Sequence, residues 1–156
     1  MTEQELLLKA DEFIEANMED IIRDIKAVVD IPSVKSEAKE GAPFGVEVRR
    51  ALGKALEIGE RMGFKTVNCG DYLGYAELVG EKEEYIGTIA HLDVVPAGNG
   101  WNTDPYDMVV KDGYLMGRGV VDNKGPLILT YYMGKFFKDL GTTLPYSLRM
   151  MAGCDE

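Results

Sequence analysis

The only histidine of the chain, His91, directly follows an apolar run and precedes Asp93 by two positions. Imidazole and carboxylate groups are the ligands that zinc and related divalent metals take from proteins. Because residues two apart on extended backbone point the same way, Asp93 can accept a hydrogen bond from the His91 ring nitrogen that faces away from a metal. The pair predicts a metal ligand with its orienting group, although a plain strand-end histidine beside a solvated carboxylate has the same sequence.

Two more acidic segments accompany this pair. Asp122 lies in a glycine-rich stretch, and Asp155 and Glu156 come directly after the last apolar run. Glycines permit tight backbone at a site, so Asp122 is a candidate to hold a carboxylate between two metal ions. The alternatives are a helix cap at Asp122 or Asn123 and a solvated terminus at Asp155 and Glu156. Together the three segments predict one metal site assembled from separate parts of the chain.

The elements that position these segments follow from periodicity. Thr2 and Glu5 form a capping box ahead of a helical pattern that runs to Val29, and Asn17 is the expected break between two helices. A second amphipathic helix is predicted over about 45–62, where Gly63 would end it.

Beyond Gly63 the pattern changes to short β-rich runs. Strands are predicted over 65–69, 72–79, 85–90 and 146–152, with a hairpin over 108–116 and a helix over 124–140. The run 85–90 is nearly all apolar or small, which is typical of a central strand buried on both faces. Helices followed by strands mixed with one more helix indicate a layered α/β domain.

Composition narrows the classes of protein. The 156 residues suit one domain with a real core, and 17 basic against 27 acidic residues give a net charge of −10, which argues against a nucleic-acid partner. No apolar stretch approaches the ~20 residues of a membrane helix, and the N-terminus is acidic where a signal peptide is basic. Cys69 and Cys154 form no close pair and are expected to be reduced, mostly buried thiols, so a cytoplasmic location is predicted.

A fixed order of short motifs runs through the second half of the chain. In sequence these are His91–Gly98, Gly100-Trp101, Asp104–Tyr106, Asp112-Gly113, Gly117–Gly119 and Asp122–Pro126. This order closely resembles the dinuclear zinc metallopeptidase family of carnosinases, acyl-amino-acid deacylases and desuccinylases (peptidase family M20), and within it the bacterial PepV-type dipeptidases. The resemblance extends over essentially the whole chain and is strongest from His91 to Glu156. It implies a three-layer α/β/α catalytic domain with a mixed sheet.

The resemblance also implies a role for each candidate residue. His91 is expected to bind one zinc, Asp93 to orient it, and Asp122 to be shared by both metals in a loop that often holds a cis Asp–Asn peptide in this family. Glu156 is the expected general base for hydrolysis of a peptide bond by a metal-bridging water. The implied cofactor is Zn²⁺, two per intact active site, with Mn or Co as alternatives.

The same resemblance predicts that residues 1–156 are the N-terminal part of the catalytic domain, truncated after Glu156, without the lid domain and the C-terminal part. The fragment alone is then expected to be inactive or nearly so and to bind Zn²⁺ weakly, if at all, because further ligands would come from downstream sequence. A small peptide is the expected substrate, with no nucleic-acid or membrane partner, and homo-oligomer formation stays open. Two alternatives remain: an N-acyl amino-acid deacylase of the same family, and a non-catalytic truncated product.

Overall fold

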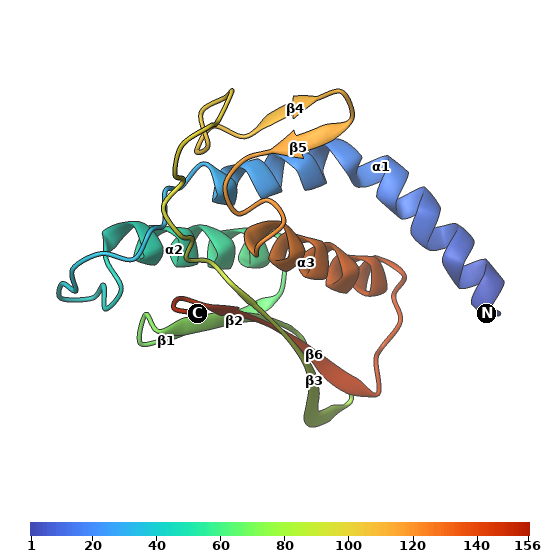
Figure 1. Cartoon of the computed structure of the whole chain (residues 1–156). Helices are drawn as coiled ribbons and strands as arrows, with labels where there is room; N and C mark the ends of the chain where they lie inside the picture. Colours follow the sequence, from blue (N-terminus) through green and yellow to red (C-terminus); the bar gives the residue numbers. More distant parts are fainter.

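The computed structural model describes residues 1–156 as three helices, a four-stranded sheet and a separate two-stranded hairpin (Figure 1). In chain order the elements are α1 (Glu3–Val29), α2 (Val46–Arg61), β1 (Lys65–Cys69), β2 (Leu73–Leu78), β3 (Lys82–His91), β4 (Val109–Lys111), β5 (Tyr114–Met116), α3 (Lys124–Asp139) and β6 (Tyr146–Gly153). None of the three helices combines the length and the apolar character needed to cross a membrane.

The first helix is one continuous element. Its capping box is formed as predicted, because the Thr2 side chain accepts from Glu5 N–H and the Glu5 side chain accepts from Thr2 N–H. The predicted break at Asn17 is wrong. The Asn17 amide donates to the carbonyl of Phe13 at 2.8 Å, four residues earlier, so this polar side chain is satisfied along the helix without interrupting it.

The main sheet is mixed, as expected, with the strand order β1-β2-β6-β3. The β1–β2 and β2–β6 pairs are antiparallel, whereas β3 and β6 run parallel. All three helices lie on one side of this sheet, with α2 over β1 and β2, α3 over β3 and β6, and α1 packed on α2 and α3 (Figure 1). The α/β class is confirmed, and the helical layer expected on the opposite side has no counterpart within residues 1–156.

The strand β3 is an edge strand, so the prediction of a central strand buried on both faces is wrong. Its only neighbour in the sheet is β6, and most of its residues are exposed, including Ile86 at 61% and Ile89 at 74%. Burial is confined to its C-terminal end, where Ala90 lies under the helices. An apolar run predicts a strand but does not say which strands will flank it. Here β6 is the interior strand that lies between β2 and β3.

The hairpin β4–β5 forms as predicted and is tied to the end of α1. Asp112 and Gly113 both have positive φ in its turn, which matches the right-handed twist of a tight hairpin. Next to the hairpin, Met108 N–H donates to Asp30 Oδ1 at 2.7 Å, and Lys26 Nζ donates to the Met108 carbonyl at 2.9 Å. The long connection between β3 and α3 is therefore fixed to α1 partway along its course.

One buried carboxylate joins the three helices. Asp24 of α1 is 1% exposed, and its Oδ2 accepts a hydrogen bond from the Tyr132 hydroxyl of α3 at 2.7 Å. The same oxygen binds Arg61 at the end of α2, and Arg23 Nε approaches Oδ1 at 3.3 Å. A buried carboxylate is stable only when such donors satisfy it, so these contacts fix the relative positions of the helices.

We therefore expect Asp24→Ala to lower the free energy of unfolding by about 3 kcal/mol, because it leaves the Tyr132 hydroxyl and the Arg61 guanidinium without their acceptor. Asp20→Ala is the matched control on the same helix, since Asp20 is half exposed and pairs only with Arg23. The control should change stability by less than about 0.5 kcal/mol. Urea denaturation measures both, and equal losses would contradict this role of Asp24.

The two cysteines have opposite environments. Cys154 is 1% exposed, and burial raises the pKa of its thiol to about 12, whereas Cys69 at the end of β1 is exposed. The expectation of mostly buried thiols therefore holds for Cys154 alone. A buried thiol of such high pKa is a poor nucleophile and a poor metal ligand.

A thiol-specific chromogenic disulfide should accordingly modify Cys69 of the native chain rapidly. It should modify Cys154 only as fast as the fold opens. The rapid phase should disappear in Cys69→Ser and persist in Cys154→Ser. Rapid modification of Cys154 in the folded chain would show that the end of β6 is not packed as described.

Candidate metal centre

His91 closes the strand β3 at the edge of the sheet. It pairs across the ladder with Gly153 of β6, and the next residue, Leu92, donates its N–H to the Gly153 carbonyl at 2.9 Å. Because β3 and β6 are parallel, both strands end at the same edge of the sheet. The His91 side chain is 14% exposed.

Asp122 reaches His91 from the segment that leads into α3. The Asp122 Oδ1 atom lies 2.9 Å from His91 Nε2, and the Asp122–Asn123 peptide is cis, as the resemblance implies. The alternative of a helix cap receives no support, because Asn123 occupies the cap position without any side-chain cap hydrogen bond. The Asp122 carboxylate faces the histidine instead of its own helix.

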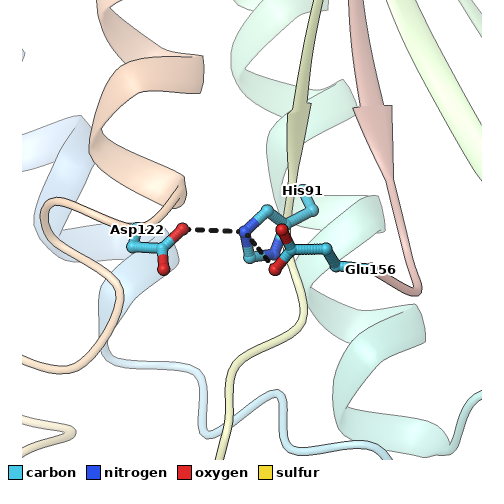
Figure 2. Close-up of side chains that lie close together, drawn as sticks. All are labelled: His91, Asp122 and Glu156. Atoms are coloured by element: carbon cyan, nitrogen blue, oxygen red, sulfur yellow. Dashed lines mark hydrogen bonds and ion pairs between the residues drawn. The ribbon is translucent and has the colours of Figure 1, made fainter.

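Glu156 completes the cluster from the residues just after β6. Its Oε2 atom lies 3.3 Å from His91 Nε2, and single ligand atoms of His91, Asp122 and Glu156 all lie within 4.8 Å of one another (Figure 2). Asp155, the other acidic residue of this segment, lies outside the cluster and pairs with Lys35 at 2.8 Å. Of the two terminal carboxylates, the fold brings only that of Glu156 to the histidine.

Asp93 lies on the opposite side of the imidazole ring. His91 Nδ1 is 2.9 Å from the backbone carbonyl of Asp93 and 3.5 Å from its carboxylate Oδ1. A carbonyl can only accept, so Nδ1 must donate the proton, and in the neutral ring this leaves the lone pair of Nε2 for a metal. The Asp93 Oδ1 atom is buried without a hydrogen-bond partner, and its Oδ2 accepts from the backbone N–H of Glu156 at 3.4 Å. Asp93 therefore contacts both the histidine and the segment that carries Glu156.

The charge state of His91 reflects these neighbours. Burial favours the neutral ring. The charged ring is favoured by its hydrogen bonds to Asp122 and to the Asp93 carbonyl, and by the negative charges of Asp93 and Glu156. Their combined effect raises the pKa of His91 above its ordinary value. Without a metal, the imidazolium form is thus the one that these acidic groups stabilise.

The cluster matches the donor set of a zinc site. Imidazole nitrogens and carboxylate oxygens are both zinc ligands in proteins, and a catalytic zinc takes three protein ligands with water in the fourth position. The spacing between Nε2 and the two carboxylates, 2.9 and 3.3 Å, lets one small cation contact all three groups. A second metal would need more ligands than His91, Asp122 and Glu156 supply.

A cleft adjoins the cluster. It has a volume of about 850 Å³, is lined by the long connection and the β4–β5 hairpin, and reaches Asp122 at one end. Arg118 lies in its wall, where one guanidinium nitrogen donates to the Ala97 carbonyl at 3.1 Å and the group stands 5.5 Å from the Trp101 ring. The cleft gives a small ligand room beside the carboxylate of Asp122.

Two fully buried polar residues near the cluster are not predicted from the sequence. Lys124 and Ser33 are both 0% exposed, and each donates to a backbone carbonyl distant in sequence. Burial lowers the pKa of Lys124 to about 8, against the opposing influence of Asp30 and Asp93. The available sequence signal is the position of Lys124 two residues after Asp122, and no periodicity distinguishes it from an exposed first-turn lysine.

The chain is similar in sequence to known proteins. Residues 87–156 match the model of "Peptidase family M20/M25/M40". The chain is 41% identical over 140 residues to "Putative dipeptidase YtjP" of Bacillus subtilis (strain 168), covering 88% of this chain and 30% of that protein. "Putative dipeptidase SAUSA300_1697" of Staphylococcus aureus (strain USA300) is 38% identical over 138 residues, covering 87% of this chain and 29% of that protein. The chain thus spans about 30% of the length of these curated relatives.

Two solved structures share the fold of this chain. The crystal structure of human carnosine dipeptidase 1 superimposes with a TM-score of 0.81 at 28% identity, over 97% of this chain and 35% of that one. The M20 family metallo-carboxypeptidase Sso-CP2 from Sulfolobus solfataricus gives a TM-score of 0.70 at 21% identity, over 90% and 31% of the two chains, and shares the fold. The resemblance stated from the sequence is confirmed.

We expect Zn²⁺ to bind this chain weakly through the cluster, because the cluster offers at most three ligand atoms and the side chains of Asp122 and Glu156 are 77% and 71% exposed. His91→Ala should abolish the heat of Zn²⁺ binding in isothermal calorimetry, and Asp122→Asn should weaken it. Asp155→Asn is the matched control, since it removes a neighbouring charge outside the cluster. Zn²⁺ binding that is tight and independent of His91 would refute this assignment of the site.

Proposed function

We propose, on the premise that residues 87–156 belong to peptidase family M20/M25/M40, that this chain carries part of the active site of a metal-dependent dipeptidase. The observation that carries the proposal is the convergence of His91, Asp122 and Glu156 from three separate segments onto one point. Residues 1–156 are then the N-terminal part of a catalytic domain, in keeping with the 30% of each curated relative that they match.

In this proposal each residue has a distinct task. His91 Nε2 and Asp122 Oδ1 would hold the metal, and Asp93 fixes the ring of His91 through its carbonyl and carboxylate. A zinc ion bound there would supply Lewis-acid chemistry, lowering the pKa of a water molecule and polarising the scissile carbonyl. Glu156 takes the proton from the attacking water and returns it to the leaving amine. Its 71% exposed side chain leaves the carboxylate free to reach a substrate.

The metal is proposed as zinc, two ions per intact active site, with Mn or Co as alternatives. Imidazole combined with carboxylate is a donor set that zinc accepts readily. Because residues 1–156 supply His91 and Asp122 as ligands and Glu156 as the base, the remaining ligands would come from outside residues 1–156. The 156-residue chain alone should therefore hydrolyse dipeptides slowly or not at all.

Short peptides are the proposed substrates. The named relatives are described as dipeptidases, and the cleft of about 850 Å³ beside Asp122 has room for a small peptide. The predictions of a cytoplasmic location and of possible homo-oligomers belong to this proposal and await their own tests. A deacylase of the same family shares these residues, and substrate preference distinguishes it from a dipeptidase.

The complete product of the reading frame that contains this chain should hydrolyse unblocked dipeptides in the presence of Zn²⁺. Glu156→Gln should lower kcat by roughly 10²–10⁴-fold, because it removes the group that accepts the proton. Zn²⁺ content, measured by elemental analysis, should stay near the wild-type level, and Asp155→Asn should retain activity. Amine release from a panel of dipeptides gives the rates.

Three results would change the conclusion. Hydrolysis of N-acyl amino acids but not of unblocked dipeptides would assign a deacylase. No turnover of either class by the complete, zinc-loaded product would favour the non-catalytic alternative. Rapid turnover by the 156-residue chain alone would show that its own residues suffice.

A further inference from the structure

The loop that follows α1 supports the segment carrying His91. Ser33 is fully buried, and its Oγ donates to the Leu92 carbonyl at 2.6 Å, one residue beyond His91. The Ser33 carbonyl accepts from Val94 N–H at 3.0 Å, and Val34 forms a parallel bridge with Val94. Residues 92–94 are thus bonded on both sides of Asp93 to this one loop.

The same loop also supports the segment carrying Asp122. Lys124 extends into the interior, where its Nζ donates to the Ile31 carbonyl at 2.7 Å, two residues before Ser33. The backbone N–H of Lys124 binds the Gly119 carbonyl at 3.0 Å, and a Cβ on Gly119 would stand 3.0 Å from both Lys124 Cδ and Val94 Cγ1. The glycine-rich segment at Gly119 therefore packs closely against the aliphatic part of the Lys124 side chain.

A fully buried lysine at position 124 lowers the stability of the fold unless its ammonium group makes a specific contact. Burial of an ammonium group is unfavourable, and a methionine of similar length would fill the same space without that cost. What methionine lacks is a donor for the Ile31 carbonyl. The contact that only lysine makes is the one that ties the Asp122 segment to the loop already holding His91.

We propose that residues 31–34 are the shared support of the metal centre and that Lys124 is its positioning residue, holding the Asp122 carboxylate against His91 through the Ile31 carbonyl. The inference rests on the metal centre proposed above, but it makes a claim about the metal-free chain as well. Lys124 touches neither metal nor substrate and acts through the placement of Asp122.

The test compares Lys124→Met with Lys138→Met in the 156-residue chain. Lys138 is the matched control, because it lies at the other end of α3 and its Nζ also donates to a distant backbone carbonyl, that of Met62. His91 is the only histidine, so its ring resonances in the NMR spectrum report on the cluster without ambiguity. Thermal unfolding and a Zn²⁺ titration followed by the same resonances complete the measurement.

Lys124→Met should displace or broaden the His91 ring resonances in the metal-free chain and weaken Zn²⁺ binding about 10-fold or more, as loss of an outer partner of a metal ligand does. Lys138→Met should leave both unchanged, whatever it does to the unfolding temperature. Ser33→Ala removes the other anchor at small steric cost and should alter the same resonances, which decides the question if Lys124→Met fails to fold.

The proposal is overturned if folded Lys124→Met, or Ser33→Ala in its place, keeps the wild-type His91 resonances and Zn²⁺ affinity. It is equally overturned if Lys138→Met causes the same loss, since the effect would then follow stability alone. If the wild-type chain binds no Zn²⁺, the metal centre fails for this chain, and the metal-free resonances still decide the role of Lys124.

Discussion

The parallel pairing of β3 with β6 is the constraint on which the rest of the site depends. It places His91 opposite Gly153, so that the residues following each strand leave the sheet side by side. A shift of one residue in this register would turn the imidazole to the other face of the sheet, away from Glu156. Parallel strands need a long crossover, and here the crossover contains α3 and the segment that carries Asp122. The unit formed by β3, α3 and β6 thus positions the side chains of His91, Asp122 and Glu156.

Two buried charges of opposite sign serve different parts of the fold. Asp24 is surrounded by donors from α2 and α3 and holds the helical layer together. Lys124 lies under the segment next to the cluster and binds a backbone carbonyl of the loop after α1. In each case the group bridges elements far apart in sequence, and apolar packing alone would not fix that relative placement so narrowly. Specific polar contacts add direction to a core whose hydrophobic contacts are non-directional.

The sequence predicts most of the local structure of this chain. Capping residues, helical periodicity and the Asp-Gly turn correctly indicate the helices and the β4–β5 hairpin, because these signals are local. The errors at Asn17 and at β3 have a common origin in tertiary context. A side chain bonded within its own helix and a strand flanked on one side only both depend on contacts that no short window of sequence contains.

The candidate site shows the same division. His91, Asp122 and Glu156 are suggested by residue type and by their positions after apolar runs, and the fold brings them together. The bond from His91 Nδ1 to the Asp93 carbonyl, shorter than the distance to the carboxylate, is not visible in an H-x-D pattern. No sequence pattern indicates the burial of Lys124 and Ser33, since only the folded chain shows that they are buried and which carbonyls they bind.

The strand order has a consequence for how the chain folds. β2 and β3 follow each other in sequence yet do not pair, because β6 is inserted between them. Until β6 arrives, the facing edges of β2 and β3 expose unpaired backbone groups, and closure of the sheet requires contacts across more than 60 residues. Such non-local closure is slow compared with helix or hairpin formation. The cluster therefore cannot assemble before β6 has paired with β3, so a bound metal would couple the site to closure of the sheet.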